Sequence, residues 1–334
     1  MSSFLLNDDT VSCTAQFVYG TLSLLYRWYR LMIVRDKNNS FRLLFAWSGT
    51  ILPKVLPALL IVVLISAILV YLGSHHYFTI PAVPAIGFTI FGVILSIFLS
   101  FRNNACYDRW WEGRKLWGAL IANSRHISRD SHVLSTERRN ILMYRVMLFT
   151  HLLRDRLRAQ PQSFEFYHDK VDFNSTQLQQ LSTKINAAQY VLEAIQKDLV
   201  LALRNAEISD IVYNSLNQHI VDLGNIQAGC DRILSTPLPF SYSVLLHRTV
   251  YCFCFILPFS LEASLGIWTP ILVGLIAYLF LGLDALSSQI EEPFGLQDND
   301  LPLNSIVRLI EREMSESLDI ELPPAIQPNH HNLT

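Results

Sequence analysis

Apolar residues dominate the chain between residues 55 and 101, and no Asp, Glu, Lys or Arg interrupts them. About 20 apolar residues cross the hydrocarbon core of a bilayer, so this stretch is too long for one membrane-spanning helix. A glycine at Gly73 and two prolines, Pro81 and Pro84, break it in the middle. The pattern therefore predicts a transmembrane hairpin. We place the hairpin at residues 53–101, with its two spans near residues 57–72 and 85–101.

A second apolar stretch follows a long polar block and covers residues 244–284. It predicts a second hairpin, because a turn at 259–267 divides it into two spans of suitable length. Glu262 is the only acidic or basic residue of this turn. We place the third and fourth spans near residues 245–258 and 268–283.

The polar block between the hairpins, residues 102–243, has helical periodicity throughout. The second span is expected to continue as a helix through Trp117 into Arg125. Residues 133–158 predict a basic amphipathic helix, with its arginines either solvated or bound to lipid. Apolar residues three or four apart from Leu178 to Leu199 predict a long helix, capped by Asn174, Ser175 or Thr176, and residues 207–226 continue the helical pattern. The C-terminal segment, 285–334, is expected to be flexible from residue 311.

Positive charge is distributed unevenly along the chain. Lys and Arg are absent from both predicted outer turns, but they are frequent in the N-terminal arm (residues 1–52) and in the polar block. The positive-inside rule therefore places both termini and the polar block in the cytoplasm. The predicted fold class is all-α, a polytopic membrane protein with four transmembrane helices and a large helical cytoplasmic region.

Composition supports a membrane protein and narrows its partners. The chain is 51% hydrophobic and only 16% charged, whereas charged residues make up about 25% of soluble domains. Its net charge of -2 predicts no attraction to nucleic acid. Five cysteines lack the spacing of metal ligands and are expected to be reduced and packed. No glycine-rich phosphate loop or nucleophile motif occurs, so no cofactor is predicted.

Two stripes run along the predicted second span, each with a residue at every fourth position. Small residues form one stripe (Gly92, Ser96 and Ser100), and large apolar residues form the other (Val93, Ile97 and Phe101). The small stripe is expected to pack closely against a neighbouring helix. The large stripe faces lipid, a protein core or a water-filled axis, and the spacing alone does not choose among them.

Three motifs carry a resemblance to a known family. The second span runs into Tyr107-Asp108-Arg109-Trp110-Trp111-Glu112, and Thr236-Pro237-Leu238-Pro239-Phe240 precedes the third span. Gln289-Ile290-Glu291-Glu292-Pro293-Phe294-Gly295 follows the fourth. In this order the motifs resemble the bestrophin family of ion channels, and the short chain resembles its bacterial members. The resemblance implies a homopentamer in the bacterial inner membrane.

The resemblance also implies roles for particular residues. The second span would line a central pore, so that Val93, Ile97 and Phe101 stack as an apolar neck. A cytoplasmic constriction would lie at Ile211, beside Asp210. The motif residues would join helices and subunits, and Trp110, Trp111 and Trp117 would anchor the cytoplasmic end of the span. These family-motif residues are Arg109, Trp110, Trp111, Glu112, Pro237 and Pro239.

Calcium-activated bestrophins have a run of acidic residues after the last motif. Here Gln289, Asp298 and Asp300 remain, but Leu296, Gln297 and Asn299 interrupt the run. Calcium prefers six to eight oxygen ligands, several of them carboxylates. The remnant is too poor in charge for a calcium clasp, so calcium binding is not expected.

The predicted function is a channel for small monovalent inorganic ions. The family is classed as anion (chloride) channels, whereas bacterial-type members can favour monovalent cations, so the sign of the ion stays open. The expected partners are further copies of the chain, membrane lipid and the ions. A non-conducting membrane scaffold or sensor is the alternative. A membrane enzyme built on Asp108, Arg109, Glu112 and Arg114 is less favoured, because such spacing is typical of ordinary helical ion pairs.

Overall fold

The computed structural model describes residues 49–75, 84–161, 167 and 169–327. Helices form all the regular structure of these residues, and no strand occurs among them. The helices are α3 (Leu52–Ser74), α4 (Ala85–Asp130), α5 (Thr136–Leu157), α6 (Ser175–Thr183), α7 (Ala187–Arg204), α8 (Asp210–Ser235), α9 (Phe240–Leu265), α10 (Thr269–Ile290) and α11 (Leu303–Ser317), with short 3-10 turns η1 (Ser131–Val133) and η3 (Gly266–Trp268).

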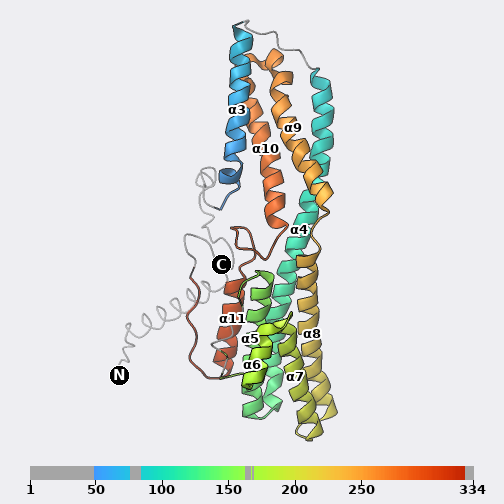
Figure 1. The fold of residues 1–334 in the computed structure, drawn as a ribbon, viewed down its shortest axis with the longest axis vertical. Helices are drawn as coiled ribbons and strands as arrows, with labels where there is room; N and C mark the ends of the chain where they lie inside the picture. Colours follow the sequence, from blue (N-terminus) through green and yellow to red (C-terminus); the bar gives the residue numbers. More distant parts are fainter. Residues whose placement is uncertain (1–48, 76–83, 162–166, 168, 328–334) are drawn as a thin grey trace, which may run out of the picture.

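The helices form two bundles, stacked end to end (Figure 1). The apolar bundle contains α3, α9, α10 and the first half of α4, and its core includes Val62, Leu95 and Val250. The polar bundle contains the second half of α4 with α5, α6, α7, α8 and α11, around a larger core that includes Trp117 and Phe149. Because α4 belongs to both bundles, it connects them rigidly.

Helix α4 is 46 residues long and ends at Asp130. At a rise of 1.5 Å per residue it extends over about 70 Å, roughly twice the thickness of a hydrocarbon core. The helix therefore continues well past the apolar bundle, as the sequence indicates, and it ends five residues beyond Arg125.

Among the described residues, three helical stretches are long and apolar enough to cross a membrane: Leu52–Ser74, Ile86–Val133 and Phe240–Ile290. The third contains two helices, α9 and α10, which η3 joins and which lie side by side (Figure 1). Helix α9 continues to Leu265, so most of the turn expected at 259–267 is helical. Helix α10 also packs closely against α3 at Gly274, where an added Cβ would lie only 3.0 Å from Val63 Cγ2.

The long helix expected from Leu178 to Leu199 is wrong, because the structure divides it into α6 and α7. Asn174 caps α6 in a capping box with Gln177, but α6 ends at Thr183 and Asn186 caps a new helix, α7. The left-handed Ala206 then ends α7, and Ser209 caps α8. Side-chain caps compete with continued helix, so periodicity of apolar residues alone does not detect these breaks.

The flexible tail expected from residue 311 begins later in the structure. Helix α11 continues to Ser317 and buries Ile310, Glu311 and Met314. The N-terminal arm up to residue 48, the centre of the first outer turn (76–83) and the end of the tail (328–334) lie outside the described residues. Three of the described cysteines are buried as expected, whereas Cys252 is exposed.

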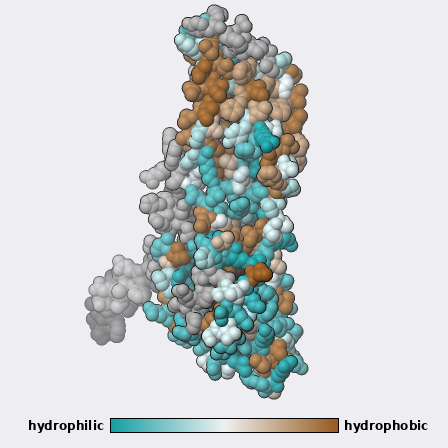
Figure 2. Space-filling model, in the orientation of Figure 1, coloured by the Kyte–Doolittle hydropathy of each residue, from teal (hydrophilic) through white to brown (hydrophobic). Residues whose placement is uncertain are grey.

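The surface changes character along the molecule (Figure 2). Hydrophobic residues cover the end formed by the apolar bundle, and hydrophilic residues cover most of the polar bundle. Large side chains such as Leu64, Ile90 and Leu275 are exposed on the apolar bundle. An apolar surface of this extent is rare on soluble proteins and is typical of contact with lipid or further chains.

Candidate functional site

The two faces of α4 within the apolar bundle differ sharply. Leu95 and Leu99 face the chain's own helices and are 2% and 1% exposed. Val93, Ile97 and Phe101 are 55%, 49% and 63% exposed. The described helices therefore leave the three large apolar residues of the second stripe uncovered. We call Val93, Ile97 and Phe101 the neck face.

The small-residue stripe packs only in part. Gly92 lies against α9, where an added Cβ would come within 3.3 Å of Phe253 Cζ. Ser96 and Ser100 are exposed, so the packing of this part of the stripe against a neighbouring helix stays a prediction. Leu95 and Leu99 make the contact with the chain's own helices.

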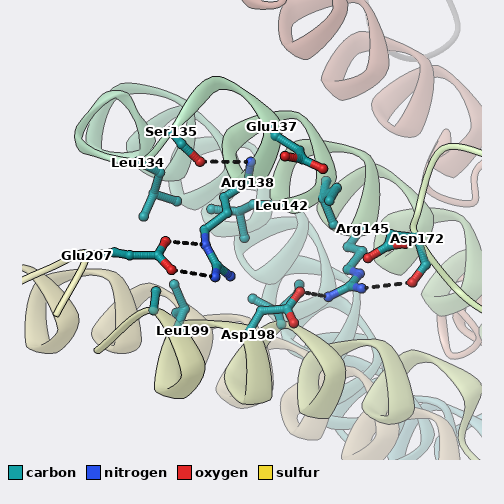
Figure 3. Close-up of a pocket in the computed structure, with 13 residues that line it drawn as sticks. Leu134, Ser135, Glu137, Arg138, Leu142, Arg145, Asp172, Asp198, Leu199 and Glu207 are labelled. Carbon is teal, nitrogen blue, oxygen red and sulfur yellow. Dashed lines mark hydrogen bonds and ion pairs between the residues drawn. The ribbon is translucent and has the colours of Figure 1, made fainter. Parts of the chain in front are cut away.

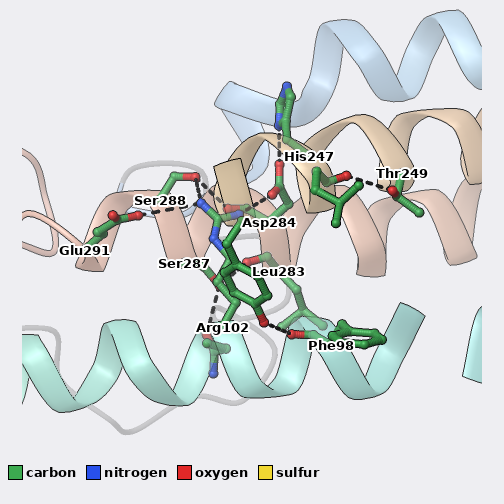
Figure 4. A network of polar contacts seen from close by, with 12 residues as sticks. Phe98, Arg102, His247, Thr249, Leu283, Asp284, Ser287, Ser288 and Glu291 are labelled. Carbon is green, nitrogen blue, oxygen red and sulfur yellow. Dashed lines mark hydrogen bonds and ion pairs between the residues drawn. The ribbon is translucent and has the colours of Figure 1, made fainter. Parts of the chain in front are cut away.

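A buried polar cluster closes the lower end of the apolar bundle (Figure 4). Arg102 of α4 forms an ion pair with Asp284 of α10 at 2.5 Å, and the side chains are 3% and 5% exposed. Arg102 Nη2 also donates to Ser288 Oγ at 2.9 Å. The second carboxylate oxygen of Asp284 lies 2.7 Å from His247 Nδ1 of α9. The cluster thus joins three helices at one level.

The three motifs, far apart in the sequence, meet just below this cluster. Arg109 donates to the backbone carbonyls of Ile233 (2.6 Å), Thr236 and Glu291 (3.2 Å). These carbonyls belong to the ends of α8 and α10, whose negative dipole ends favour a cation. The Glu291 carboxylate accepts from the backbone N–H of Leu238 at 3.1 Å, between Pro237 and Pro239. We call this meeting point the motif junction.

The tryptophans beside Arg109 have different environments. Trp110 Nε1 donates to the carbonyl of Asn299 at 3.0 Å and holds the loop after α10. Trp111 is about half exposed and stacks on Tyr107 with centroids 6.5 Å apart. Trp117 is fully buried in the polar bundle, so it is a core residue and does not anchor the span at a membrane surface as expected. Glu112 forms an exposed ion pair with Arg232.

The loop after the last motif is ordered by its own contacts. Asp300 is buried, and its Oδ2 accepts from the backbone N–H of Gln297 at 2.7 Å. Burial raises the pKa of Asp300 to about 6. The Gln289 side chain accepts from Asn299 at 3.2 Å, and Asp298 is exposed.

The absence of a calcium clasp stays a prediction. Calcium needs several oxygens directed at one point, and one oxygen of Asp300 is already bound by the backbone N–H of Gln297. Within the described ranges, no three His, Cys, Asp or Glu side chains lie close enough to hold a metal ion.

The region of the expected cytoplasmic constriction lies at the start of α8. Asp210 is the first residue of the helix, and both it and Ile211 are exposed, Ile211 by 83%. Arg138 of α5 holds the preceding turn through a two-pronged ion pair with Glu207, at 2.6 and 2.9 Å (Figure 3). This pair and that of Arg145 with Asp198 border a cavity of about 370 Å³ between α5 and α7.

The arginines of α5 do not form a solvated face. Arg145 is buried and donates to the carbonyl of Val171 at 2.9 Å, and Arg156 pairs with Asp231 at 2.8 Å. Arg154 pairs with the adjacent Asp155. The helix therefore uses its positive charge within the polar bundle, and the expectation of a solvated basic face is wrong for most of it.

A second buried cluster joins α5 to α11. Glu311 Oε1 accepts from Tyr167 at 2.5 Å and lies 2.6 Å from His151 Nε2. Burial alone would raise the pKa of Glu311, but the contacts with His151 and Tyr167 outweigh it and leave this pKa below its usual value. Burial and the neighbouring carboxylate raise the pKa of Tyr167. The cluster stabilises the polar bundle.

Our sequence analysis missed Asp284 and His247. Their signal is that each is an ionisable residue within the apolar stretch 244–284, where such residues are rare and need partners. Asp284 is the only acidic residue between Glu262 and Glu291. Its partner, Arg102, marks the end of the uncharged run, but the sequence does not indicate that the two meet.

Taken together, the apolar bundle with its hydrophobic surface and the helical polar bundle define a membrane protein of several spans. The comparisons give the family. Residues 32–316 match the family described as "Bacterial/Fungal Bestrophin protein". The chain therefore belongs to the bacterial and fungal bestrophin family, and the resemblance inferred from the three motifs is confirmed.

Relatives and solved structures agree with this assignment. A protein of Escherichia coli K12 named "Voltage-dependent anion channel-forming protein YneE" is 38% identical over 306 residues, which cover 90% of this chain and 99% of the relative. The Salmonella typhi protein of the same name is 39% identical, with 88% and 96% covered. A crystal structure of a bacterial bestrophin homologue from Klebsiella pneumoniae has a TM-score of 0.74 at 29% identity, with 80% and 99% covered.

The family and the names of these relatives also decide between channel and enzyme. The relatives are named as channel-forming proteins. The prediction of an ion-channel family protein rather than an enzyme is therefore confirmed.

Proposed function

We propose that this chain is one subunit of a channel that passes small monovalent inorganic ions through a central pore. The observation that carries the proposal is the neck face, which is apolar and uncovered on the side of α4 away from its own bundle. In the proposed assembly, a homopentamer, five copies of α4 surround the axis. Helices α3, α4, α9 and α10 would give four spans in the bacterial inner membrane, with both termini cytoplasmic.

The neck face suits a hydrophobic constriction. Val93, Ile97 and Phe101 recur at every fourth residue and extend over about 12 Å of helix. Five copies would form three stacked apolar rings. A narrow apolar constriction gates by losing its water and does not bind the ion strongly. The neck would therefore control passage without selecting the sign of the charge.

The start of α8 is the proposed second constriction. Ile211 is exposed at the end of the polar bundle, and the Arg138–Glu207 ion pair fixes the turn that precedes it. Asp210 places a carboxylate beside Ile211 in the first turn of the helix. A ring of these residues would narrow the cytoplasmic end of the pore and influence whether anions or cations pass.

The sign of the ion is assigned as negative, because the relatives are named anion channel-forming proteins. The positive end of the α8 dipole beside Ile211 is compatible with anions. Asp210 and Glu207, both exposed near the same point, favour the second candidate, a channel for monovalent cations. The proposal assigns no bound calcium or other cofactor, and no nucleic acid, to this function.

Reversal potentials of the purified protein in asymmetric KCl test the sign. We expect a shift toward the chloride equilibrium potential, and a shift toward the potassium potential would contradict the anion assignment. If Asp210 lies at the constriction, Asp210→Asn changes the relative permeability, whereas Asp222→Asn, at a half-buried position of α8 about three turns away, leaves it unchanged.

The position of the constriction has its own test. Ile211→Ala is expected to change single-channel conductance, and Ile185→Ala is the matched control because Ile185 is equally exposed (94%) but lies between α6 and α7. Equal conductance in both variants would move the constriction away from Ile211. No current from an intact wild-type oligomer would support the alternative, a non-conducting scaffold or sensor.

A further inference from the structure

The ion pair of Arg102 and Asp284 lies where α4 leaves the apolar bundle, directly after the last residue of the neck face. Both side chains are almost fully buried. Buried ion pairs are often no more stabilising than an apolar pair of similar volume, because both charges lose their water. Their best-attested contribution is to specify one register between the two elements that carry them. The pair therefore bears on how α4 is oriented.

The position of Arg102 on α4 suits this role. Successive helical residues are rotated by about 100°, so Arg102 lies about 140° from Ile97 around the helix axis. Arg102 is on the side of Leu95 and Leu99, which is buried against the chain's own helices. An attachment on this side directs the neck face away from them.

Helix α10 offers Arg102 a matching row of acceptors. Asp284 and Ser288 bind its guanidinium, and Glu291 Oε2 lies 3.7 Å from Nη2. These positions are spaced by four and three residues and share one face of α10. A planar guanidinium held by several acceptors has one preferred direction. A rotation of α4 would break all of these contacts together.

The same row connects to the motif junction. Glu291 accepts from the backbone N–H of Leu238, and its carbonyl accepts from Arg109, which lies about two helical turns beyond Arg102. His247 of α9 holds the other oxygen of Asp284. Polar contacts therefore connect α4, α9 and α10 (Figure 4), and Arg109 extends the set to the end of α8.

We propose that Arg102 and Asp284 are positioning residues for the pore: their buried ion pair sets the rotation of α4 that points Val93, Ile97 and Phe101 at the axis. Neither residue touches the permeating ion. The inference rests on the proposed function, because it takes the neck face as the lining of the pore.

The test replaces the pair by apolar residues of similar size, Arg102→Met with Asp284→Leu, so that neither charge is left alone. Single cysteines at Ile97 and at Phe98 report the orientation of α4, because Phe98 is equally exposed but lies about 100° away from Ile97. Each oligomer is labelled with a charged, water-soluble methanethiosulfonate reagent, and the parent protein without a new cysteine corrects for native thiols. In the wild type, we expect faster labelling at position 97 than at 98.

In the apolar double variant, the ratio of the two labelling rates is expected to fall by about tenfold, which corresponds to a loss of about 1.4 kcal/mol in orientational preference. Assembly and thermal stability are expected to stay close to wild type. Arg102→Lys is a milder second variant, because an ammonium keeps the charge but does not hold several acceptors in one plane. It is expected to lower the ratio in the same direction.

A wild-type ratio in both variants would overturn the proposal, and so would equal labelling of positions 97 and 98 in the wild type. If the double variant fails to assemble, the ratio in Arg102→Lys decides. Because labelling is measured without current, a protein that conducts no ions but shows the expected loss of ratio would contradict the proposed function and leave the orienting role of the pair intact.

Discussion

Arg109 connects the ends of two helices, and its replacement by methionine tests the motif junction. The side chain donates to the carbonyls of Ile233, Thr236 and Glu291. Hydrogen bonds from a charged donor contribute about 1.5–3 kcal/mol each when they are removed one at a time. The Thr236 carbonyl is exposed, so water replaces that bond, whereas the other two are partly buried. Loss of two such bonds predicts a destabilisation of about 4 kcal/mol.

Thermal unfolding of the detergent-purified oligomer measures the effect. A loss of this size corresponds to a decrease in Tm of roughly 10 °C. Arg114→Met is the matched control, because the Arg114 side chain makes no hydrogen bond or ion pair with the described residues, and it should change stability by less than about 0.5 kcal/mol. If Arg109→Met and Arg114→Met have the same Tm, the contacts of the junction do not stabilise the fold and this reasoning is refuted.

Two further predictions concern the loop after α10 and the cluster of α5 and α11. Gly295→Ala is expected to lower the Tm, because the added Cβ would collide with Asp300 Oδ2 and displace its hydrogen bond from the backbone N–H of Gln297. Gly224→Ala is the control, because a Cβ there meets open space. An unchanged Tm of Gly295→Ala would contradict this prediction. Glu311→Gln is expected to lower stability at neutral pH, because the pKa of Glu311 is lower in the folded than in the unfolded protein. The ionised carboxylate therefore stabilises the fold fully above about pH 5, and this stabilisation is lost as the pH falls below about 4. Unfolding curves across this range would show the difference closing at low pH, and a constant difference would argue against an ionised Glu311.

Much of the apolar bundle could be predicted, because its signal is local. An uncharged run that is too long for one span, broken by Gly73 and the prolines, is sufficient for a hairpin. The extension of α4 past Trp117 follows from uninterrupted helical residues. The three motifs were recognisable in order, although only the structure shows that Arg109 brings their ends together.

The remaining features depend on contacts between distant residues. Acceptors elsewhere in the polar bundle, such as the Val171 carbonyl and Asp231, decide which arginines of α5 are solvated. Trp117 was expected at a membrane surface, but the adjoining helices bury it. Arg102 and Asp284 are 182 residues apart, so their pairing leaves no trace in any local pattern.

The central claim is that α4 lines an ion-conducting pore through its apolar neck. Single-channel recording of purified protein in a planar bilayer, comparing wild type with Ile97→Ala, tests it most directly. We expect current from both proteins and a larger conductance from the variant, because a smaller side chain widens the apolar ring and eases its wetting. Equal conductance from the two would remove Ile97 from the pore, and no current from either intact oligomer would contradict the channel itself.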